Sequence, residues 1–228
     1  SGAYKIHVSI GPVATSAQIA AEDVAALVSG AAWDHLNLTY GFPNATTDYP
    51  TVFKEIDSPA DNFESFNAAQ RAAAVQQFAM ISRVTSLTFT ERTDAPGQAD
   101  LRYAMSDEAD VAYAFYPTNR GPTSAGGSAW FNNSAGRFDN PVLGNYSWMG
   151  ILHETGHALG LKHGHEFPAI SGDRDSLEYS VMTYRSYPGG SITGGYSNES
   201  FGYPQTLMMY DIAALQQMYG ANFATQAG

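Results

Sequence analysis

Apolar residues recur at helical spacing in four stretches of the chain. Residues 17–28 and 64–84 show this pattern in the first half, and residues 146–159 and 207–219 show it in the second. A glycine follows three of the four stretches, which is typical of a helix C-terminus because glycine tolerates the left-handed conformation. The pattern therefore predicts four helices.

Short segments rich in apolar and aromatic residues lie among these helices, and we interpret them as strands. They are residues 37–43, which run into a turn, and residues 87–90, 99–105, 112–116 and 126–131. Helices alternating with short strands predict an α+β fold with a twisted, mixed, five-stranded sheet backed by helices.

Residues 164–203 show little periodicity and are rich in glycine, serine, tyrosine and proline. Some forty irregular residues inside a compact domain are unusual unless they serve a function. We expect a single domain over residues 1–228, with an N-terminal lobe of about residues 1–163 and a C-terminal lobe of about 164–228. The cleft lies between the lobes, and the irregular C-terminal lobe ends in the last helix.

Composition narrows the classes of function. Hydrophobic residues make up 44% of the 228, which is enough for a packed core. The net charge of −11 gives no electrostatic reason to bind nucleic acid or an anionic membrane, and no apolar run is long enough to span a bilayer. Because the chain has no cysteine, disulfides and thiolate sites are excluded, and any metal must have nitrogen and oxygen ligands.

The most specific motif is HETGHALGLKH at residues 153–163. His153 and His157 are four residues apart, so a helix places both imidazoles on one face, with Glu154 beside them. Gly160 can end the helix and reverse the chain, which brings His163 back as a third ligand. Three neutral imidazoles leave coordination positions open, as in a catalytic site for one Zn²⁺. A chance match on an exposed helix is the alternative, and the placement of Gly160 and His163 argues against it.

A second motif, SVMTY, occupies residues 180–184. A methionine beside an aromatic residue is usually core packing. After this zinc motif, however, the segment is similar to the methionine turn of metzincins. That resemblance implies that Met182 forms an apolar floor beneath the three imidazoles and that Tyr184 points its phenol toward the zinc as a candidate fifth ligand. For Tyr184, a buried hydroxyl bonded to backbone is the alternative.

The chain resembles the metzincin clan, and most closely the serralysin family of bacterial secreted metalloproteases. The resemblance rests on LTYGFP, AYAFYP, GGSAWFN, the zinc motif, SVMTY and the final MMYDIAALQQMYGAN. Astacins share the tyrosine but carry disulfides. Two departures stand out: Gly164 replaces the usual proline, and the glycine- and aspartate-rich repeats of a C-terminal β-roll do not occur in the sequence. We therefore expect Ca²⁺ only if the full-length protein has such a β-roll.

The resemblance implies a zincin-like fold with an active-site helix, and an endopeptidase that hydrolyses internal bonds of extended protein substrates. Glu154 is then the general base, and Tyr184 donates a hydrogen bond to the oxyanion. We expect a secreted monomer, exported by a type I route without a signal peptide. Its expected partners are protein or peptide substrates and a proteinaceous inhibitor, without nucleic acid and without membrane insertion.

Substrate is expected to pair with an edge strand within residues 111–116, where Ala112, Tyr113, Ala114 and Phe115 are the candidate contacts. An interior strand without an open edge is the alternative. The segment around residues 179–187 is expected to wall the pocket that takes the residue after the scissile bond. Arg185 would bias that pocket toward acidic side chains.

Two other interpretations stay open from the sequence. One is a non-catalytic binding module that keeps a metzincin-like shell, although such relics usually lose the glutamate or a ligand. The other is a latent enzyme in which residues 1–30 act as a remnant pro-segment.

Overall fold

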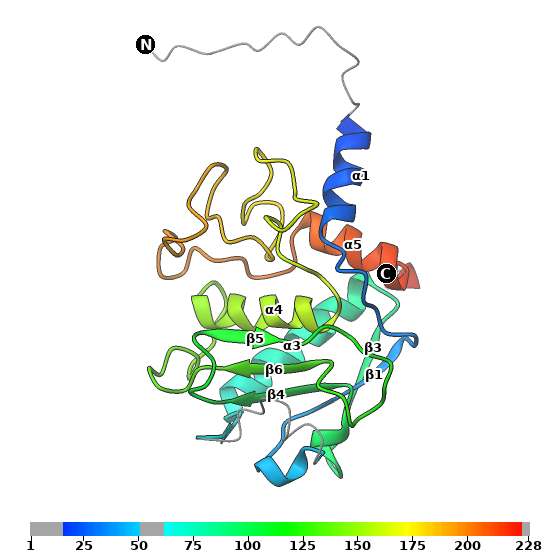
Figure 1. The fold of residues 1–228 in the computed structure, drawn as a ribbon, viewed down its shortest axis with the longest axis vertical. Coiled ribbons are helices and arrows are strands. Elements are labelled where there is room, and N and C mark those ends of the chain that lie inside the picture. The colour runs from blue at the N-terminus through cyan, green and yellow to red at the C-terminus, as the bar shows by residue number, and fades with distance from the viewer. Residues whose placement is uncertain (1–15, 51–61, 225–228) are drawn as a thin grey trace, which may run out of the picture.

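The computed structural model describes residues 16–50 and 62–224, and its mixed sheet carries helices on one face (Figure 1). The helices are α1 (Ser16–Ala26), α3 (Ala68–Val84), α4 (Tyr146–Ala158) and α5 (Met209–Tyr219), with short 3-10 turns η1 (Thr46–Asp48) and η2 (Pro96–Gln98). The strands are β1 (Asn37–Gly41), β2 (Glu64–Ser65), β3 (Thr88–Glu91), β4 (Leu101–Met105), β5 (Ala112–Ala114) and β6 (Ser128–Phe131).

The strand order in the sheet is β3-β1-β4-β6-β5. Strands β3, β1, β4 and β6 are mutually parallel neighbours, whereas β5 pairs antiparallel with β6. The two-residue β2 pairs antiparallel with β4, beyond the point where β1 ends. Within the described chain β5 therefore forms one edge of the sheet and has β6 as its one partner strand.

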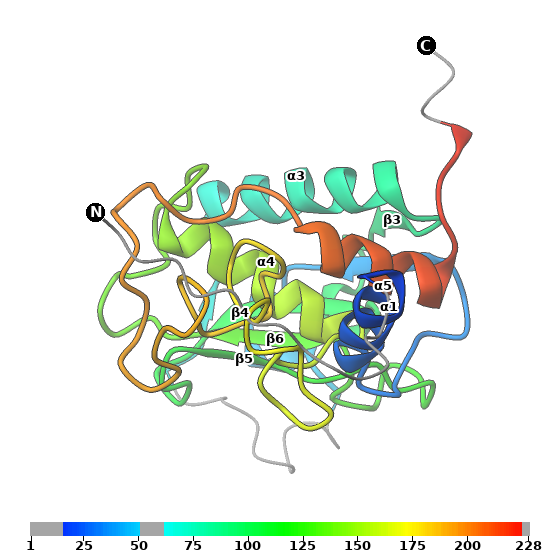
Figure 2. The ribbon, with the colours of Figure 1, turned by 90° about the horizontal axis from the view of Figure 1, so that it is seen from above.

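Helices α3 and α4 lie side by side on one face of the sheet (Figure 2). The main core fills the space between them and the sheet, because alternate strand residues such as Leu101, Tyr103 and Phe131 point to this face. Tyr103 also reaches α4, where its hydroxyl lies 3.0 Å from Thr155 Oγ1. The helix that carries the zinc motif is thus fixed directly to the sheet.

The opposite face of the sheet holds a smaller aromatic cluster. Tyr49, Ala104 and Trp130 are buried there, and Tyr113 and Phe115 pack against them. The rings of Tyr49 and Trp130 stack at 5.1 Å between centroids. This alternation leaves Ala112 and Ala114 of β5 on the α4 face and Tyr113, followed by Phe115, on the far face.

The predicted elements are confirmed with shifts of one to two residues at most ends, and two details differ. The sheet has six strands rather than five, because residues 64–65, expected to begin a helix, form β2. Helix α3 starts at Ala68 instead. The Asn67 side chain accepts from Gln70 N at 3.0 Å and Gln70 Oε1 accepts from Asn67 N at 2.6 Å, a reciprocal cap that fixes the start.

Helix α1 packs against α5, next to the C-terminal half of the chain rather than with the sheet (Figures 1 and 2). Asp23 on α1 accepts hydrogen bonds from Ser171 N and Oγ, both at 2.7 Å, and pairs with Arg174 at 3.2 Å. Residues 16–30 are thus built into the fold. Residues 1–15 of the suggested pro-segment lie outside the described residues, and the division into lobes near residue 163 stays a prediction.

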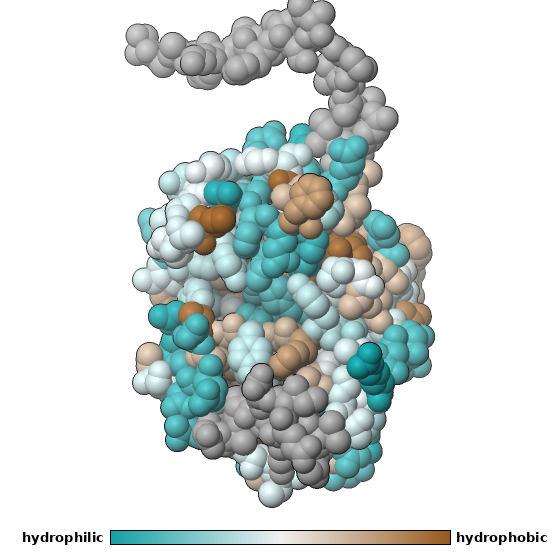
Figure 3. All heavy atoms as spheres, in the orientation of Figure 1, coloured by the Kyte–Doolittle hydropathy of each residue, from teal (hydrophilic) through white to brown (hydrophobic). Residues whose placement is uncertain are grey.

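No helix within residues 16–50 and 62–224 is long and apolar enough to cross a bilayer. On the face shown in Figure 3, apolar residues form separate small areas rather than one continuous patch.

Candidate metal centre

Helix α4 lies between the sheet and the irregular segment, which we define as residues 162–208. The Asn145 side chain caps the helix by accepting from Trp148 N at 2.9 Å. All residues from Ser147 to Ala158 are buried. Trp148 Nε1 donates to Gln205 O at 2.8 Å, which ties the helix to the irregular segment above it.

The chain reverses directly after α4, and this turn carries the third histidine. Gly160 has a φ of +100°, and a Cβ there would clash with the carbonyl oxygen of Ala31. Residues 27–29 hold the turn from outside, since Ser29 N donates to Gly160 O at 3.0 Å and Lys162 N donates to Leu27 O at 2.8 Å. Glycine is therefore required both by the backbone angle and by the close approach of residues 27–31.

The turn brings His163 to His153 and His157, as the motif predicts. One ligand atom from each of the three side chains lies within 4.8 Å of the others. The Nε2 atoms of His157 and His163 are 3.0 Å apart, and the ring centroids of His153 and His157 are 4.8 Å apart. Within the described residues this is the one group of three or more such side chains close enough to hold a metal ion.

Each imidazole is oriented by an oxygen on its Nδ1 side. His153 Nδ1 lies 2.7 Å from Val181 O, His157 Nδ1 lies 2.7 Å from Leu161 O, and His163 Nδ1 lies 2.8 Å from Glu166 Oε1. An Nδ1–H donated to these oxygens leaves the Nε2 lone pair for a metal, and such partners are characteristic of histidine ligands.

Burial keeps the three rings neutral. Together with a smaller effect of the neighbouring histidines, it lowers the pKa of His153 and of His157 from 6.5 to about 3 each, and the pKa of His163 to about 4. Neutral imidazoles with converging Nε2 atoms are the donor set that Zn²⁺ takes in catalytic sites. The residues present therefore fit a zinc ion.

Glu154 lines a cavity next to His153. Burial raises the pKa of its carboxyl from 4.5 to about 8, and its Oε2 atom is buried with no hydrogen-bond partner among the described residues. A buried carboxyl with an unused oxygen at the wall of a cavity is a candidate acid–base group.

The methionine turn packs beneath α4. Met182 is fully buried, and its Sδ fills the place that a Cβ on Gly156 would take. Asp211 on α5 holds the turn: its carboxylate accepts from Ser180 Oγ at 2.6 Å and from Val181 N at 2.9 Å. Since Val181 O is the partner of His153, Asp211 supports the first histidine through one residue of backbone.

Tyr184 lies beside the histidines, as the second motif predicts. Its ring centroid is 4.5 Å from that of His163 and 5.9 Å from that of His153. Burial, with a smaller contribution from the carboxyl of Glu154, raises the pKa of its phenol to about 12. His165 stacks on His163 at 5.3 Å between centroids but is not in the metal-binding group.

A cavity of about 550 Å³ opens next to His153 and Glu154. Helix α4, the start of β5, the loop before α4 and the irregular segment all contribute to its wall. Its lining residues are Val111, Ala112, Arg137, Phe138, Tyr146, Met149, Gly150, His153, Glu154, Tyr184, Ile192, Gly195, Tyr196 and Tyr203.

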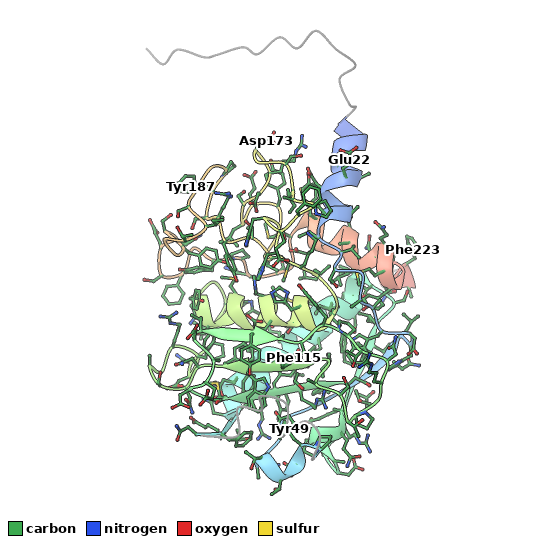
Figure 4. The ribbon with its side chains drawn as sticks, viewed as in Figure 1. Glu22, Tyr49, Phe115, Asp173, Tyr187 and Phe223 are labelled. Atoms are coloured by element: carbon green, nitrogen blue, oxygen red, sulfur yellow. The ribbon has the colours of Figure 1, made fainter. Side chains whose placement is uncertain are left out.

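The candidate substrate strand lies at the cavity. Ala112 lines it, and Ala114 also packs on the α4 side of the sheet. Tyr113 and Phe115 instead direct their side chains to the far-face cluster; Figure 4 labels Phe115 there, on the other side of α4 from Tyr187. Contact of these two residues with a substrate is therefore limited to their backbone.

Arg185 does not line the cavity. Its Nε donates to Asp175 Oδ2 at 2.8 Å, and its Nη1 donates to the carbonyl of Gly190. Because its guanidinium is engaged inside the irregular segment, the structure gives no support to the predicted bias by Arg185. Of the predicted wall, residues 179–187, Tyr184 is the member that lines the cavity.

Three residues near the site could not be predicted from the sequence. Nothing in the sequence indicated the contact of Glu166 with His163. Asp211 lies in a regular helical pattern with no local signal. Arg137 precedes the predicted active-site helix by nine residues, and its place at the cavity depends on how the loop folds back.

The chain is similar in sequence to several known metalloproteases. The chain is 33% identical to Serralysin C of Dickeya chrysanthemi over 229 residues, covering 93% of this chain and 45% of that protein. It is 34% identical to Serralysin B of the same organism, over 84% of this chain and 40% of the relative. It is 32% identical to the metallopeptidase AprA of Pseudomonas marginalis, over 85% of this chain and 42% of that protein. No protein-family profile matches. The chain spans less than half the length of these relatives.

Proposed function

The chain belongs to the serralysin family of metalloproteases, and on that premise we propose that it is the catalytic domain of a zinc-dependent endopeptidase. The observation that carries the proposal is the convergence of three neutral histidines, two buried and one partly buried, beside a buried carboxyl at the wall of a cavity. His153, His157 and His163 would hold the zinc. When bound, zinc supplies a Lewis acid that polarises a carbonyl and lowers the pKa of water to about 7.

Glu154 is the proposed general base. Without a metal its raised pKa of about 8 keeps the carboxyl largely protonated at neutral pH. A metal cation held by the three neutral histidines would favour the ionised form of this carboxyl. The carboxylate can accept a proton from the water that attacks the peptide carbonyl. The same carboxyl can then deliver that proton to the leaving amine.

Tyr184 is the proposed oxyanion donor. Its phenol is protonated at neutral pH, since its pKa of about 12 lies far above 7, so it can donate to the carbonyl oxygen as negative charge develops. Its position at both the histidines and the cavity wall supports this role.

The open edge of β5 is the proposed binding strand for an extended peptide. The bonds of Phe115 N to Ser128 O and of Asn132 N to Val111 O fix the ladder with β6. By antiparallel alternation, the backbone groups of Ala112 and Ala114 then point away from β6 and toward the open edge. Their small side chains leave room for a peptide on the α4 side.

The direction of that peptide follows from the two ends of β5. Residues 111–112 line the cavity, whereas Tyr116 lies beside His157 at 5.7 Å between ring centroids. A peptide antiparallel to β5 runs from the Tyr116 end toward the cavity. The cavity therefore takes a side chain on the C-terminal side of the scissile bond.

The proposal is tested by Glu154→Gln in zinc-loaded protein, with Glu178→Gln as the matched change at an exposed site. We expect E154Q to keep one zinc per chain and its melting temperature but to lose casein hydrolysis by about 10²–10⁴-fold, because the water loses its base. E178Q should keep full activity, and a chelator should abolish that activity until zinc is restored.

Full hydrolysis by E154Q would contradict the role of Glu154. A wild-type protein that binds zinc and peptides but cleaves none would instead favour the non-catalytic or latent binding module. Secretion by a type I route, a proteinaceous inhibitor, a monomeric state and a calcium-binding β-roll stay predictions.

A further inference from the structure

The cavity beside Glu154 carries one cationic side chain, that of Arg137. Arg137 is exposed, and its guanidinium lies over the ring of Tyr146 at 5.4 Å from the centroid. The same guanidinium also interacts with the Tyr146 phenol, but it carries five N–H donors, so this contact leaves others to donate. No described carboxylate forms an ion pair with Arg137.

The remaining wall is aromatic. Tyr146 meets Tyr203 at 5.6 Å and Tyr196 at 6.2 Å between ring centroids, and Phe138 lies 5.9 Å from Tyr146. Tyr196 directs its hydroxyl to Thr183 O at 2.7 Å, so its ring rather than its polar end faces the space. This wall suits the apolar stem of a long side chain.

Glu154 is the one carboxylate among the lining residues, and it belongs to the reacting end of the cavity. A long side chain that enters past the aromatic rings therefore ends near a cation with no neighbouring anion. This local charge is opposite to the net charge of the protein, which is −11.

We propose that Arg137 sets the charge preference of this cavity, so that the residue after the scissile bond is favoured as glutamate and disfavoured as lysine. The guanidinium can form paired hydrogen bonds with a carboxylate, whereas an ammonium group meets a like charge. The inference rests on the proposed function, because the cavity is a substrate subsite only if the chain is a peptidase.

Arg185 offers the internal contrast. It was the arginine expected from the sequence to bias this pocket, yet its guanidinium is held by Asp175 and Gly190 away from the cavity wall. Two arginines of the same chain thus differ in the feature that matters for specificity, which is whether a carboxylate already neutralises the guanidinium.

The experiment uses zinc-loaded protein and peptides that differ only in the residue after the cleaved bond, which is glutamate, glutamine or lysine. Mass spectrometry locates the cut, and kcat/KM gives the glutamate-to-lysine ratio for wild type, Arg137→Glu, Arg137→Gln and Arg92→Glu. Arg92 follows β3 at the opposite edge of the sheet, so R92E makes the same change in net charge far from the cavity. Melting temperatures show that each variant folds.

We expect wild type and R92E to prefer glutamate, and R137E to lower the ratio by about tenfold or more, which corresponds to about 1.4 kcal/mol. The glutamate-to-lysine ratio of R137Q should lie between the ratios of wild type and R137E. A wild-type ratio at or below one, or a ratio that R137E leaves unchanged, would overturn the inference.

A binding measurement separates this inference from the proposed function. Fluorescein-labelled glutamate and lysine peptides are titrated into zinc-loaded Glu154→Gln protein, with and without R137E, and their anisotropy gives the two dissociation constants. If wild type cleaves nothing but R137E still inverts the binding preference, the endopeptidase fails and the role of Arg137 stands. If the wild type cleaves peptides but R137E changes neither binding nor rate, the endopeptidase stands and the role of Arg137 fails.

Discussion

Helix α4 and the irregular segment, residues 162–208, contribute to the same centre in different ways. The helix supplies His153, Glu154 and His157 from one regular turn, all buried. The irregular segment supplies His163 and Tyr184, but also the groups that orient the ligands: Val181 O for His153 and Glu166 for His163. Periodic structure sets the spacing of the ligands, whereas the irregular segment sets their direction and environment.

The difference has a physical reason. A helix uses its own backbone N–H and C=O groups internally, so it has few left to orient side chains. An irregular segment leaves carbonyls free, and Val181 O is one of them. The long segment without repeated structure is therefore the part of the domain that completes the site.

The largest expected effect concerns the burial that the irregular segment imposes on α4. His153 and His157 have folded pKa values of about 3, below the ordinary value of 6.5. On acidification the unfolded chain therefore takes up protons first. The stabilisation is present above pH 6.5 and is lost as the pH falls toward 3, by several kcal/mol in total at about 1.36 kcal/mol per pKa unit.

Urea unfolding of chelator-treated protein at pH 7, 6 and 5 measures this loss. The double variant His153→Gln/His157→Gln isolates the two histidines from the carboxyls, and its free energy of unfolding should depend less steeply on pH. Equal slopes for both proteins would mean that the rings titrate normally in the folded state.

The second effect concerns the orientation of His163 by the irregular segment. Glu166→Gln replaces the carboxylate that lies 2.8 Å from His163 Nδ1. Because such partners orient the ring and raise its basicity, we expect zinc affinity to fall by about 10–100-fold. Competition with a chromophoric chelator measures it, and Glu178→Gln in the same segment is the control. Unchanged affinity would reduce Glu166 to a surface contact.

The third effect concerns the support of the methionine turn by α5. Asp211→Asn keeps the shape but turns one acceptor into a donor facing Ser180, Val181 or Met208, whose groups all donate to this carboxylate. We expect the free energy of unfolding to fall by about 1–3 kcal/mol. Asp173→Asn, at the exposed position labelled in Figure 4, should leave it unchanged. Equal urea midpoints for the two variants would show that Asp211 does not stabilise the segment that orients His153.

The smallest effect has a diagnostic sign. Gly156→Ala should stabilise an isolated helix by about 0.8–1 kcal/mol. Here the added Cβ meets Met182 Sδ, and overpacking of this kind costs about 1–3 kcal/mol. We therefore expect a lower melting temperature for G156A, whereas Gly172→Ala, which has open space around it, should differ little. A higher melting temperature for G156A would show that the methionine turn is not packed tightly against α4.

Much of the fold and the centre of the site could be predicted from the sequence. The helical period predicts that His153 and His157 share one face of a helix. Gly160 indicates the chain reversal that brings His163 close to them. The positions of the four helices and of the five longer strands along the chain could also be predicted, whereas the order of the strands in the sheet could not. The two-residue β2 could not be predicted either, because so short a strand has no pattern and is defined by its pairing with β4.

Tertiary structure alone decided the surroundings of that centre. Asp211 accepts a hydrogen bond from Val181 N, 30 positions away in the sequence. Residues 27–29, near the start of the chain, hydrogen-bond to the turn at Gly160. Arg137 and Arg185 are the same residue type near the same motif, yet only the folded chain shows which one lines the cavity. Local periodicity and glycine positions act within a few residues, whereas hydrogen-bond partners, burial and charge pairing are set by segments that meet only when the chain folds.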